Sequence, residues 1–264
     1  ERIANLEKSI GTILLDRMGR QIVPTRAGEL LYKHALMLLD MKKTAMLEME
    51  KFLGIRQGEI FMGGSTIPGE YILPRLIGKF YKKYPLISVV LTVAGSREIE
   101  DLVHKGNLEL GIVGKKSRTK DLTSYNLWSD ELVLVVNKNH KWIERKFINP
   151  DELFKEPFIT RESGSGTLKI MEDYLGSWDK KKIDDLNIAA KLGTSTAIKE
   201  GIKANLGVSI LSSRAVETDI RAGLLKTVKI KGMPKMTRSF YLIRNKRRAA
   251  SPLCQAMFDF LKKA

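Results

Sequence analysis

The sequence has few of the residues that form covalent crosslinks or hold metal ions. Its single cysteine, Cys254, excludes a disulfide within the chain and any zinc or iron–sulfur site built from several cysteines. The histidines His34, His104 and His140 lie far apart and form no pair at metal-ligand spacing. We therefore expect a protein of the reducing cytoplasm that needs neither a metal ion nor a cofactor.

Long hydrophobic runs are also missing. No apolar run approaches the roughly 18–20 residues that cross a bilayer, so we expect no membrane partner. The first residues, Glu1 to Asn5, show neither the basic nor the apolar region of a secretory signal. The sequence starts without Met and inside a helical pattern, which predicts that the natural N-terminus lies further upstream.

Catalytic motifs are the third class of feature that the sequence lacks. It contains no paired carboxylates, no P-loop and no Gly-x-Ser-x-Gly elbow. The run Gly164-Ser165-Gly166-Thr167 includes Gly-x-Gly but not the rest of a dinucleotide-binding fingerprint. His104 and His140 fit surface or helix-end positions better than catalytic ones. We therefore expect that the protein is not an enzyme.

Basic residues are present in excess. The chain carries 46 Lys and Arg against 30 Asp and Glu, a formal net charge of +16, which favours anionic partners such as nucleic acid or small anions. Nine of the basic residues, with no acidic residue among them, lie between Lys226 and Arg248. That run is either a solvated basic face or a binding surface, and the sequence leaves both open.

The first quarter of the chain shows three successive patterns. Residues 1–11 read as the end of a helix that stops at Gly11, and residues 12–25 as a hairpin with a Gly-containing turn. Thr25 is a good N-cap for a helix over 26–53, which would be about 40 Å long. Because its apolar stripe is too long for a small core, we expect this helix to pair with a second subunit.

From residue 59 onward, strand and helix patterns alternate. This alternation predicts βαβ units, a parallel sheet and two small α/β lobes. The expected strands cover 59–64, 86–93, 108–113, 127–136, 158–160, 187–192, 208–211, 224–230 and 239–243, and the expected helices cover 68–84, 97–105, 166–175, 196–205 and 251–263.

Serine and threonine recur where a predicted strand gives way to a predicted helix. Four such junctions hold Ser65-Thr66, Ser96, Ser165 to Thr167 and Thr194 to Thr196. Each hydroxyl alone can be a helix cap, which is the simpler interpretation. Helix N-termini also attract anions, and in open α/β sheets ligands bind beyond the carboxyl ends of the strands. The four junctions together therefore predict one cleft for a small anion between the lobes.

Several short motifs, in this order and spacing, resemble the family of LysR-type transcriptional regulators, and the chain looks closest to its sulfur-metabolism branch. The motifs cover nearly the whole chain: Ile3-x-x-Leu6-Glu7-x-x-Ile10-Gly11, Leu15-x-Arg17-x-Gly19-Arg20, Pro24-Thr25-x-Ala27-Gly28, Leu73-Pro74, Phe80, Tyr84-Pro85, Gly106-x-Leu108-Glu109-Leu110-Gly111-Ile112, Ile198-x-x-Gly201 and Gly207-Val208-x-Ile210-Leu211.

The resemblance implies an α/β architecture in several parts. Residues 1–25 would be the remnant of a winged helix-turn-helix DNA-binding domain, and residues 26–57 a linker helix that makes dimers or tetramers. A two-lobe effector domain, similar to periplasmic binding proteins, would follow. Its lobe I would comprise 58–137 and 241–264, and its lobe II 138–240.

The resemblance also implies roles for individual residues. The effector, a small carboxylate or oxyanion, would contact Ser65, Thr66, Ser96, Thr167, Thr194 and Thr196. DNA would contact Arg2, Arg17, Arg20 and Arg26, mainly through phosphates, because the family's most sequence-specific base contacts would lie upstream of Glu1.

A DNA-binding regulator switched by a small anion is therefore the function that the sequence favours. The alternative is a periplasmic-type solute-binding protein, which would share the two-lobe cleft but not the wing and linker helix. An enzyme ranks third, because no nucleophile–base pair, metal site or cofactor fingerprint is visible.

Overall fold

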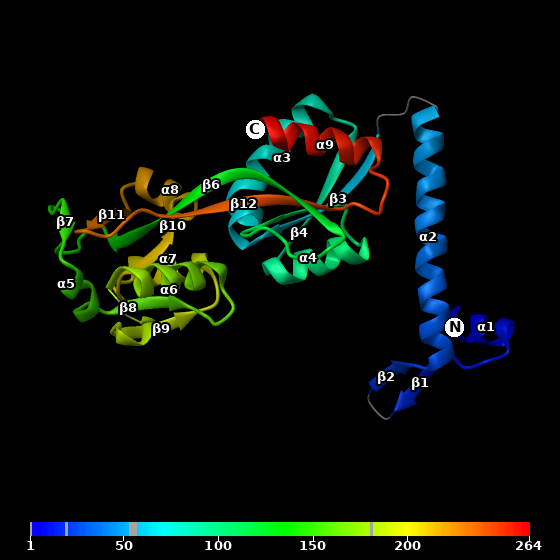
Figure 1. Cartoon of the computed structure of the whole chain (residues 1–264), viewed down its shortest axis with the longest axis horizontal. Coiled ribbons are helices and arrows are strands. Elements are labelled where there is room, and N and C mark those ends of the chain that lie inside the picture. Colours follow the sequence, from blue (N-terminus) through cyan, green and yellow to red (C-terminus); the bar gives the residue numbers. More distant parts are fainter. Residues whose placement is uncertain (1, 19–20, 53–56, 180–181) are drawn as a thin grey trace. The chain divides into compact units, whose positions relative to one another are not determined.

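Figure 1 shows the computed structural model of the chain, which describes residues 2–18, 21–52, 57–179 and 182–264. The chain divides into two compact units, residues 1–56 and 57–264. Each unit is described by itself below.

The N-terminal unit begins with a short helix and a hairpin. Helix α1 (Arg2–Ile10) ends at Gly11, whose φ of +78° allows its N–H to donate to the Glu7 carbonyl at 2.8 Å. Strands β1 (Leu15–Met18) and β2 (Gln21–Pro24) pair antiparallel. The predicted helix end and the pairing of the two hairpin strands are thus confirmed, whereas Gly19 and Arg20 of the predicted turn lie outside the described residues.

Helix α2 (Arg26–Phe52) follows directly and confirms the predicted long helix. Thr25 caps it, because its Oγ1 accepts a hydrogen bond from the Gly28 N–H at 3.0 Å. Gly28 is needed there, since a Cβ would lie 2.1 Å from the Leu14 carbonyl oxygen. In the single chain the apolar side chains of α2 stay in water, with Leu38 66% and Leu39 62% exposed.

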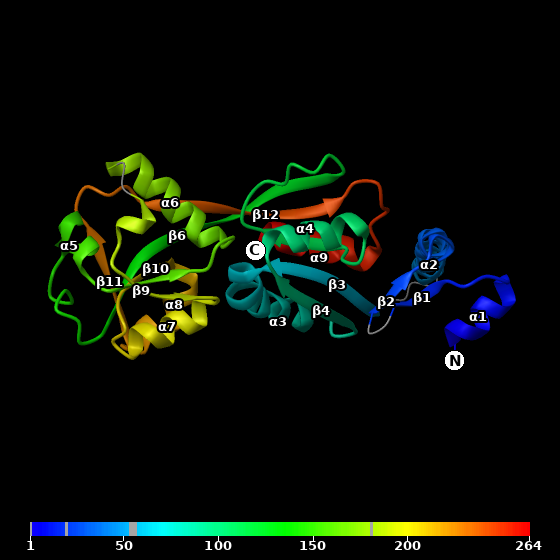
Figure 2. The same cartoon turned by 90° about the horizontal axis from the view of Figure 1, so that it is seen from below.

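Lobe I is built on three parallel strands. Strands β4 (Ile87–Ala94) and β5 (Leu110–Val113) each pair in parallel with β3 (Gly58–Ser65). Helix α4 (Ser96–Lys105) follows β4, and the C-terminal helix α9 (Pro252–Lys263) packs against the same core. Figure 2 shows α4 and α9 beside these strands.

The helix expected over 68–84 is divided in two. A π-helical turn, η1 (Pro68–Ile72), precedes helix α3 (Leu73–Lys83). Pro74 lacks an N–H, so it cannot extend a regular α-helical ladder back into η1. The turn also lies tight on β3, because a Cβ on Gly64 would come within 2.7 Å of the Gly69 Cα.

Two long strands connect the lobes. Strand β6 (Leu122–Asn137) is one continuous strand, longer than the expected 127–136, and it pairs antiparallel with β12 (Met236–Asn245). Figures 1 and 2 show the two strands running side by side from one lobe into the other. Strand β12 changes register between Phe240 and Tyr241. The predicted lobe boundaries at 137/138 and 240/241 stay predictions.

The main sheet is mixed, which corrects the expectation of a parallel sheet. Its order is β4-β3-β5-β12-β6-β11-β7, with β10 also paired to β6. Strand β12 runs antiparallel to both neighbours, because β6 carries the chain out of lobe I and β12 carries it back along β6.

Lobe II adds shorter elements around the ends of β6 and β12. Strands β8 (Phe158–Arg161) and β9 (Ile188–Leu192) form a separate parallel pair. Four elements of this lobe were not predicted from the sequence: β7 (Phe147–Ile148), α5 (Pro150–Lys155), η2 (Ile183–Asp185) and α8 (Ser213–Arg221). Four others were predicted: α6 (Gly166–Asp179), α7 (Ser195–Lys203), β10 (Ser209–Ser212) and β11 (Leu225–Ile230).

Helices α6 and α7 cover different faces of the short strands of lobe II, as Figure 2 shows. Met171 and Leu175 of α6 belong to one buried cluster, and Ile198 and Ile202 of α7 to another. Both helices nevertheless begin just beyond the carboxyl ends of the parallel strands β8 and β9. Among the described helices, none is long and apolar enough to span a bilayer.

Candidate functional site

The predicted junctions of lobe I lie at one edge of its sheet. Ser65 is the last residue of β3 and is buried, and the half-buried Thr66 follows it. Ser96 begins α4 after β4, and its Oγ accepts a hydrogen bond from the Gly114 N–H, just beyond β5, at 3.4 Å. The carboxyl ends of the three parallel strands therefore meet, as the sequence predicts.

The predicted junctions of lobe II divide into capping and other roles. Thr194 is the N-cap of α7, because its Oγ1 accepts from the Ala197 N–H at 3.0 Å. Thr196, two residues on, is exposed and makes no cap. Thr167, in the first turn of α6, is buried, and its Oγ1 accepts from Nη1 of Arg238 at 3.4 Å.

Arg161 is the first of two buried arginines near the junctions of lobe II that the sequence analysis missed. It is the last residue of β8, and its side chain is 7% exposed. Nε and Nη2 donate to the two carboxylate oxygens of Glu162, both at 2.8 Å. Nη2 also donates to the Gly193 carbonyl at 3.1 Å, and Nη1 to Ser195 Oγ at 3.4 Å. Its guanidinium therefore lies against the N-terminus of α7.

Arg238, on β12, is the second buried arginine. Its side chain is 7% exposed, and that of its partner Asp130, on β6, is fully buried. Arg238 Nε donates to Asp130 Oδ2 at 2.8 Å, while Ser212 Oγ donates to Asp130 Oδ1 at 2.7 Å. Arg238 Nη2 also lies 2.8 Å from Asp130 Oδ2, but it forms no well-directed hydrogen bond within the described residues.

The two guanidinium groups act on each other. Burial lowers the pKa of Arg238, Asp130 opposes this effect, and the positive charge of Arg161 lowers the pKa further. Each guanidinium is paired with one carboxylate, Glu162 or Asp130, and the N-termini of α6 and α7 beside the two pairs add partial positive charge that makes this part of lobe II favourable for an anion. A charged residue directly after the predicted strand Phe158-Ile159-Thr160 was the sequence signal that could have identified Arg161.

One side chain of lobe I reaches lobe II. The hydroxyl of Tyr71, in η1, lies 3.0 Å from the hydroxyl of Thr196. Lys199 Nζ lies over the Tyr71 ring, 5.2 Å from its centroid, and binds Asp219 Oδ2 at 2.9 Å. Burial raises the pKa of Tyr71, and either of the two hydroxyls can donate to the other.

The expected convergence of all six hydroxyl residues stays a prediction. Among the described hydrogen bonds, none joins Ser65, Thr66 or Ser96 directly to Thr167, Thr194 or Thr196. The contact between the lobes at these junctions passes through Tyr71 instead.

The residues predicted to contact DNA all lie in the N-terminal unit. Arg2 in α1 and Arg26 at the start of α2 are exposed. Arg17 lies in β1, whereas Arg20 lies outside the described residues. The structure thus leaves Arg2 and Arg26 accessible, and their role on DNA stays a prediction.

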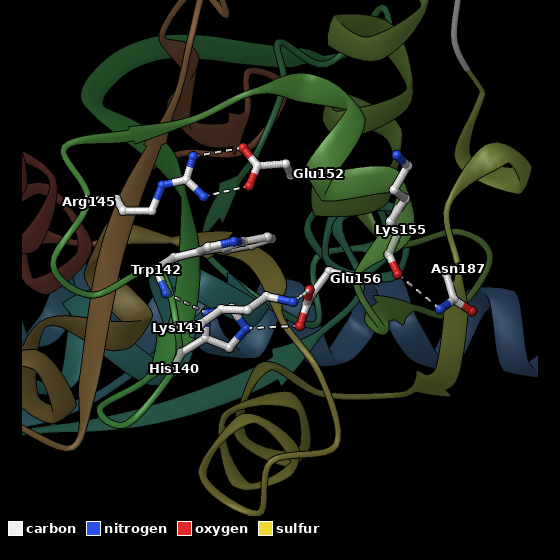
Figure 3. A network of polar contacts seen from close by, with 8 residues as sticks. All are labelled: His140, Lys141, Trp142, Arg145, Glu152, Lys155, Glu156 and Asn187. Carbon is white, nitrogen blue, oxygen red and sulfur yellow. Dashed lines mark hydrogen bonds and ion pairs between the residues drawn. The ribbon is translucent and has the colours of Figure 1, made fainter.

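His140 belongs to a network of polar contacts, as Figure 3 shows. Its Nε2 lies 3.1 Å from Glu156 Oε1, and its ring packs edge-on against the buried Trp142. His104 lies in the last turn of α4, as expected for a helix-end residue. In the described part of the chain, no group of three His, Cys, Asp or Glu side chains could hold a metal ion.

Comparisons with known proteins agree with this arrangement. Residues 54–264 match the family described as the LysR substrate binding domain. The HTH-type transcriptional activator CmpR of Synechocystis is 28% identical over 264 residues, which are 99% of this chain and 84% of CmpR. The uncharacterized HTH-type transcriptional regulator YeiE of Escherichia coli is 29% identical over 258 residues, 98% of this chain and 85% of YeiE.

Solved structures give the same result. The regulatory domain of Synechocystis CcmR in complex with 2-PG is 27% identical, with a TM-score of 0.69, covering 78% of this chain and 97% of that domain. CrgA of Neisseria meningitidis, a LysR-type transcriptional regulator, shares the fold, with a TM-score of 0.65 at 18% identity over 99% of this chain and 86% of CrgA. A match to the family over most of the chain, including the lobe that carries Arg161 and Arg238, shows that the protein belongs to the LysR-type transcriptional regulators.

Proposed function

We propose that this protein binds DNA through its N-terminal unit and a small anion through its two-lobe unit, and that the anion changes its regulatory state. It acts in the cytoplasm, as a homodimer or homotetramer, and not as an enzyme. The observation that carries this proposal is the pair of buried arginines, Arg161 and Arg238, next to the N-termini of α6 and α7.

The effector class follows from the hydrogen-bond donors near the N-termini of α6 and α7. Two guanidinium groups, the hydroxyls of Thr167 and Thr196, and the first N–H groups of two helices all favour oxygen atoms that carry negative charge. The related CcmR domain was solved with 2-PG, and the QuiR effector domain, which shares the fold, with shikimate. A small carboxylate or oxyanion therefore fits this chain, with Ser65, Thr66, Ser96 and Thr194 as the further predicted contacts.

The switch would act on the arrangement of the lobes. An anion that contacts both lobes stabilises the arrangement in which both sets of donors reach it. A shift from 1:99 to 99:1 needs about 5.5 kcal/mol of differential binding. A few charge-assisted hydrogen bonds, at about 1.5–3 kcal/mol each, are enough.

Calorimetric titration with sulfate, inorganic phosphate, 2-PG and shikimate tests the anion site. We expect at least one of these anions to bind, and Arg161→Gln to weaken its binding by tenfold or more. Arg221→Gln is the matched control, because Arg221 pairs with Glu217 on the exposed surface of α8 and lies in the same lobe. Equal affinities for the wild type and Arg161→Gln would contradict the proposal.

The DNA-binding part has its own test. Counterion release makes binding through phosphate contacts fall steeply with salt. Replacing Arg26 by Gln should reduce the slope of log affinity against log salt by about 1. Lys79→Gln in α3 is a control of equal charge outside the predicted DNA contacts. An unchanged slope in Arg26→Gln would exclude Arg26 as a phosphate contact.

The periplasmic-type solute-binding protein is the weaker alternative. Two relatives that match 98–99% of this chain are transcriptional regulators. The sulfur-metabolism branch stays a prediction, which binding of sulfate in the titration would support.

A further inference from the structure

We propose that Glu162 is a built-in competitor of the effector, occupying the carboxylate-binding edge of Arg161 until an external oxyanion displaces it. This inference rests on the proposed function, because it concerns regulation of the same anion site. It assigns to Glu162 a role that limits affinity and selects for ligands with two oxygens on one acidic centre.

The first step of the argument is the geometry of the Arg161 guanidinium. A guanidinium binds carboxylates in two-point fashion through paired N–H groups. In Arg161 the Nε and Nη2 edge is taken by Oε2 and Oε1 of Glu162, each at 2.8 Å. Of its three other N–H groups, one on Nη2 is directed at the Gly193 carbonyl and one on Nη1 at Ser195 Oγ, at the N-terminus of α7. An incoming oxyanion can therefore take this edge only where Glu162 leaves it.

The second step is the difference between the carboxylates of the two arginines. Asp130 is fully buried and receives hydrogen bonds from both Ser212 and Arg238, so it cannot move into water. Glu162 is 45% exposed, and Arg161 is its one side-chain partner within the described residues. Of the two carboxylates, Glu162 is thus the one that can turn out to solvent.

The third step is the local backbone. Glu162 opens a turn in which its carbonyl accepts from the Ser165 N–H at 3.3 Å, and Gly164 adopts a φ of +90°. This turn leads straight into α6 and leaves the Glu162 side chain at the boundary with water. Turning the Glu162 side chain out to water therefore needs little backbone strain. Arg161 stays in place because it keeps its hydrogen bonds to Gly193 and Ser195.

The fourth step is the charge balance. With Glu162 and Asp130 in place, the charges of Arg161 and Arg238 are both compensated within the chain. When Glu162 turns away, one buried positive charge is left uncompensated next to two helix N-termini. An oxyanion of at least one negative charge restores the balance, whereas a neutral ligand does not.

The test compares Glu162→Gln with the wild type in calorimetric titrations of the full chain with sulfate and inorganic phosphate. Gln keeps the size of the side chain but removes its charge, so we expect about tenfold tighter binding of both anions. The double variant Arg161→Gln/Glu162→Gln should not show the tighter binding of Glu162→Gln. Glu217→Gln, which removes a carboxylate paired with Arg221 on α8, is the matched control and should leave the affinity unchanged.

A thermal measurement gives an independent readout. Without added anion, Glu162→Gln should melt below the wild type, because Arg161 is left buried with its paired donors unfilled. Added sulfate should raise its melting temperature more than that of the wild type. A purely structural salt bridge would give the loss of stability without the larger gain from sulfate.

The possible outcomes separate the two proposals. If Glu162→Gln binds the anions no better than the wild type while Arg161→Gln binds them more weakly, the competitor role is wrong and the anion site stands. If Glu162→Gln binds more weakly, Glu162 instead positions Arg161, and the competitor role is again overturned. If neither protein binds sulfate or phosphate, or Arg161→Gln has no effect, both proposals fail.

Discussion

The hydroxyl of Tyr71 lies 3.0 Å from the hydroxyl of Thr196, and this hydrogen bond joins the π-helical turn of lobe I to the first turn of α7 in lobe II. Tyr71 can reach across because η1 is fixed on β3 by the close contact of Gly64 with Gly69. The bond links the lobes next to the proposed anion site, so we expect it to couple their arrangement to effector binding.

Replacing Tyr71 by Phe should weaken effector binding by about two- to tenfold, the equivalent of one hydrogen bond. The lobes of the ligand-free variant would separate more easily, so part of the binding free energy of the anion would be used to close them. Calorimetry measures the affinity, and small-angle scattering should show a larger radius of gyration without ligand. Tyr81→Phe, at an exposed position of α3, is the control. Identical titrations of Tyr71→Phe and wild type would show that the contact has no regulatory role.

Thr194 and Thr196 should respond differently to the same substitution. Thr194→Val removes the cap of α7 and should lower the free energy of unfolding by about 1 kcal/mol, with a smaller loss of effector affinity than Thr196→Val. Thr196→Val keeps the cap but removes a hydroxyl at the proposed site, so it should weaken effector binding roughly tenfold. Denaturant unfolding and calorimetry of both variants separate the two effects. Full effector affinity in Thr196→Val would remove this residue from the site.

Changing Leu38 and Leu39 to Glu should convert the oligomer into monomers. Both side chains are more than 60% exposed on α2 in the single chain, and charges there would be buried in a helix–helix interface. Sedimentation velocity measures the change in mass. Lys33→Glu combined with Thr44→Glu adds acidic residues on the opposite face of the same helix and serves as the control. An unchanged sedimentation coefficient in the Leu variant would place the interface elsewhere.

The ion pair of Arg145 with Glu152, visible in Figure 3, should contribute to acid sensitivity. The hydrogen bond from Arg145 lowers the pKa of Glu152 from its ordinary 4.5 to about 2. Since this pKa is lower in the folded chain, the pair stabilises the fold above about pH 4.5 and stops doing so as the pH falls towards 2.

Glu152→Gln should therefore show a shallower loss of melting temperature over that pH interval than the wild type. Glu144→Gln, at an exposed neighbouring position, is the control and should keep the wild-type slope. Equal slopes in Glu152→Gln and wild type would contradict the assigned pKa.

Local patterns were enough to predict most elements, because they depend on neighbouring residues. Gly11 ends α1, Thr25 caps α2, and the apolar run of β5 is buried, all as the sequence predicts. The short β7 and α5 escaped prediction, because two to six residues carry too little periodicity. The mixed sheet escaped as well, since strand direction depends on a partner distant in the sequence.

The candidate site shows the same division in sharper form. The sequence by itself determined that hydroxyl residues follow the parallel strands, and the family resemblance extended this to an anion effector. Only the tertiary structure decided that Arg161 and Arg238, 77 positions apart, lie close enough for one charge to lower the pKa of the other. It also decided that Thr194 is a cap while Thr196 meets Tyr71. Capping is set by a few adjacent residues, whereas the pairing of buried charges depends on where β8 and the crossover strands bring distant parts of the chain together.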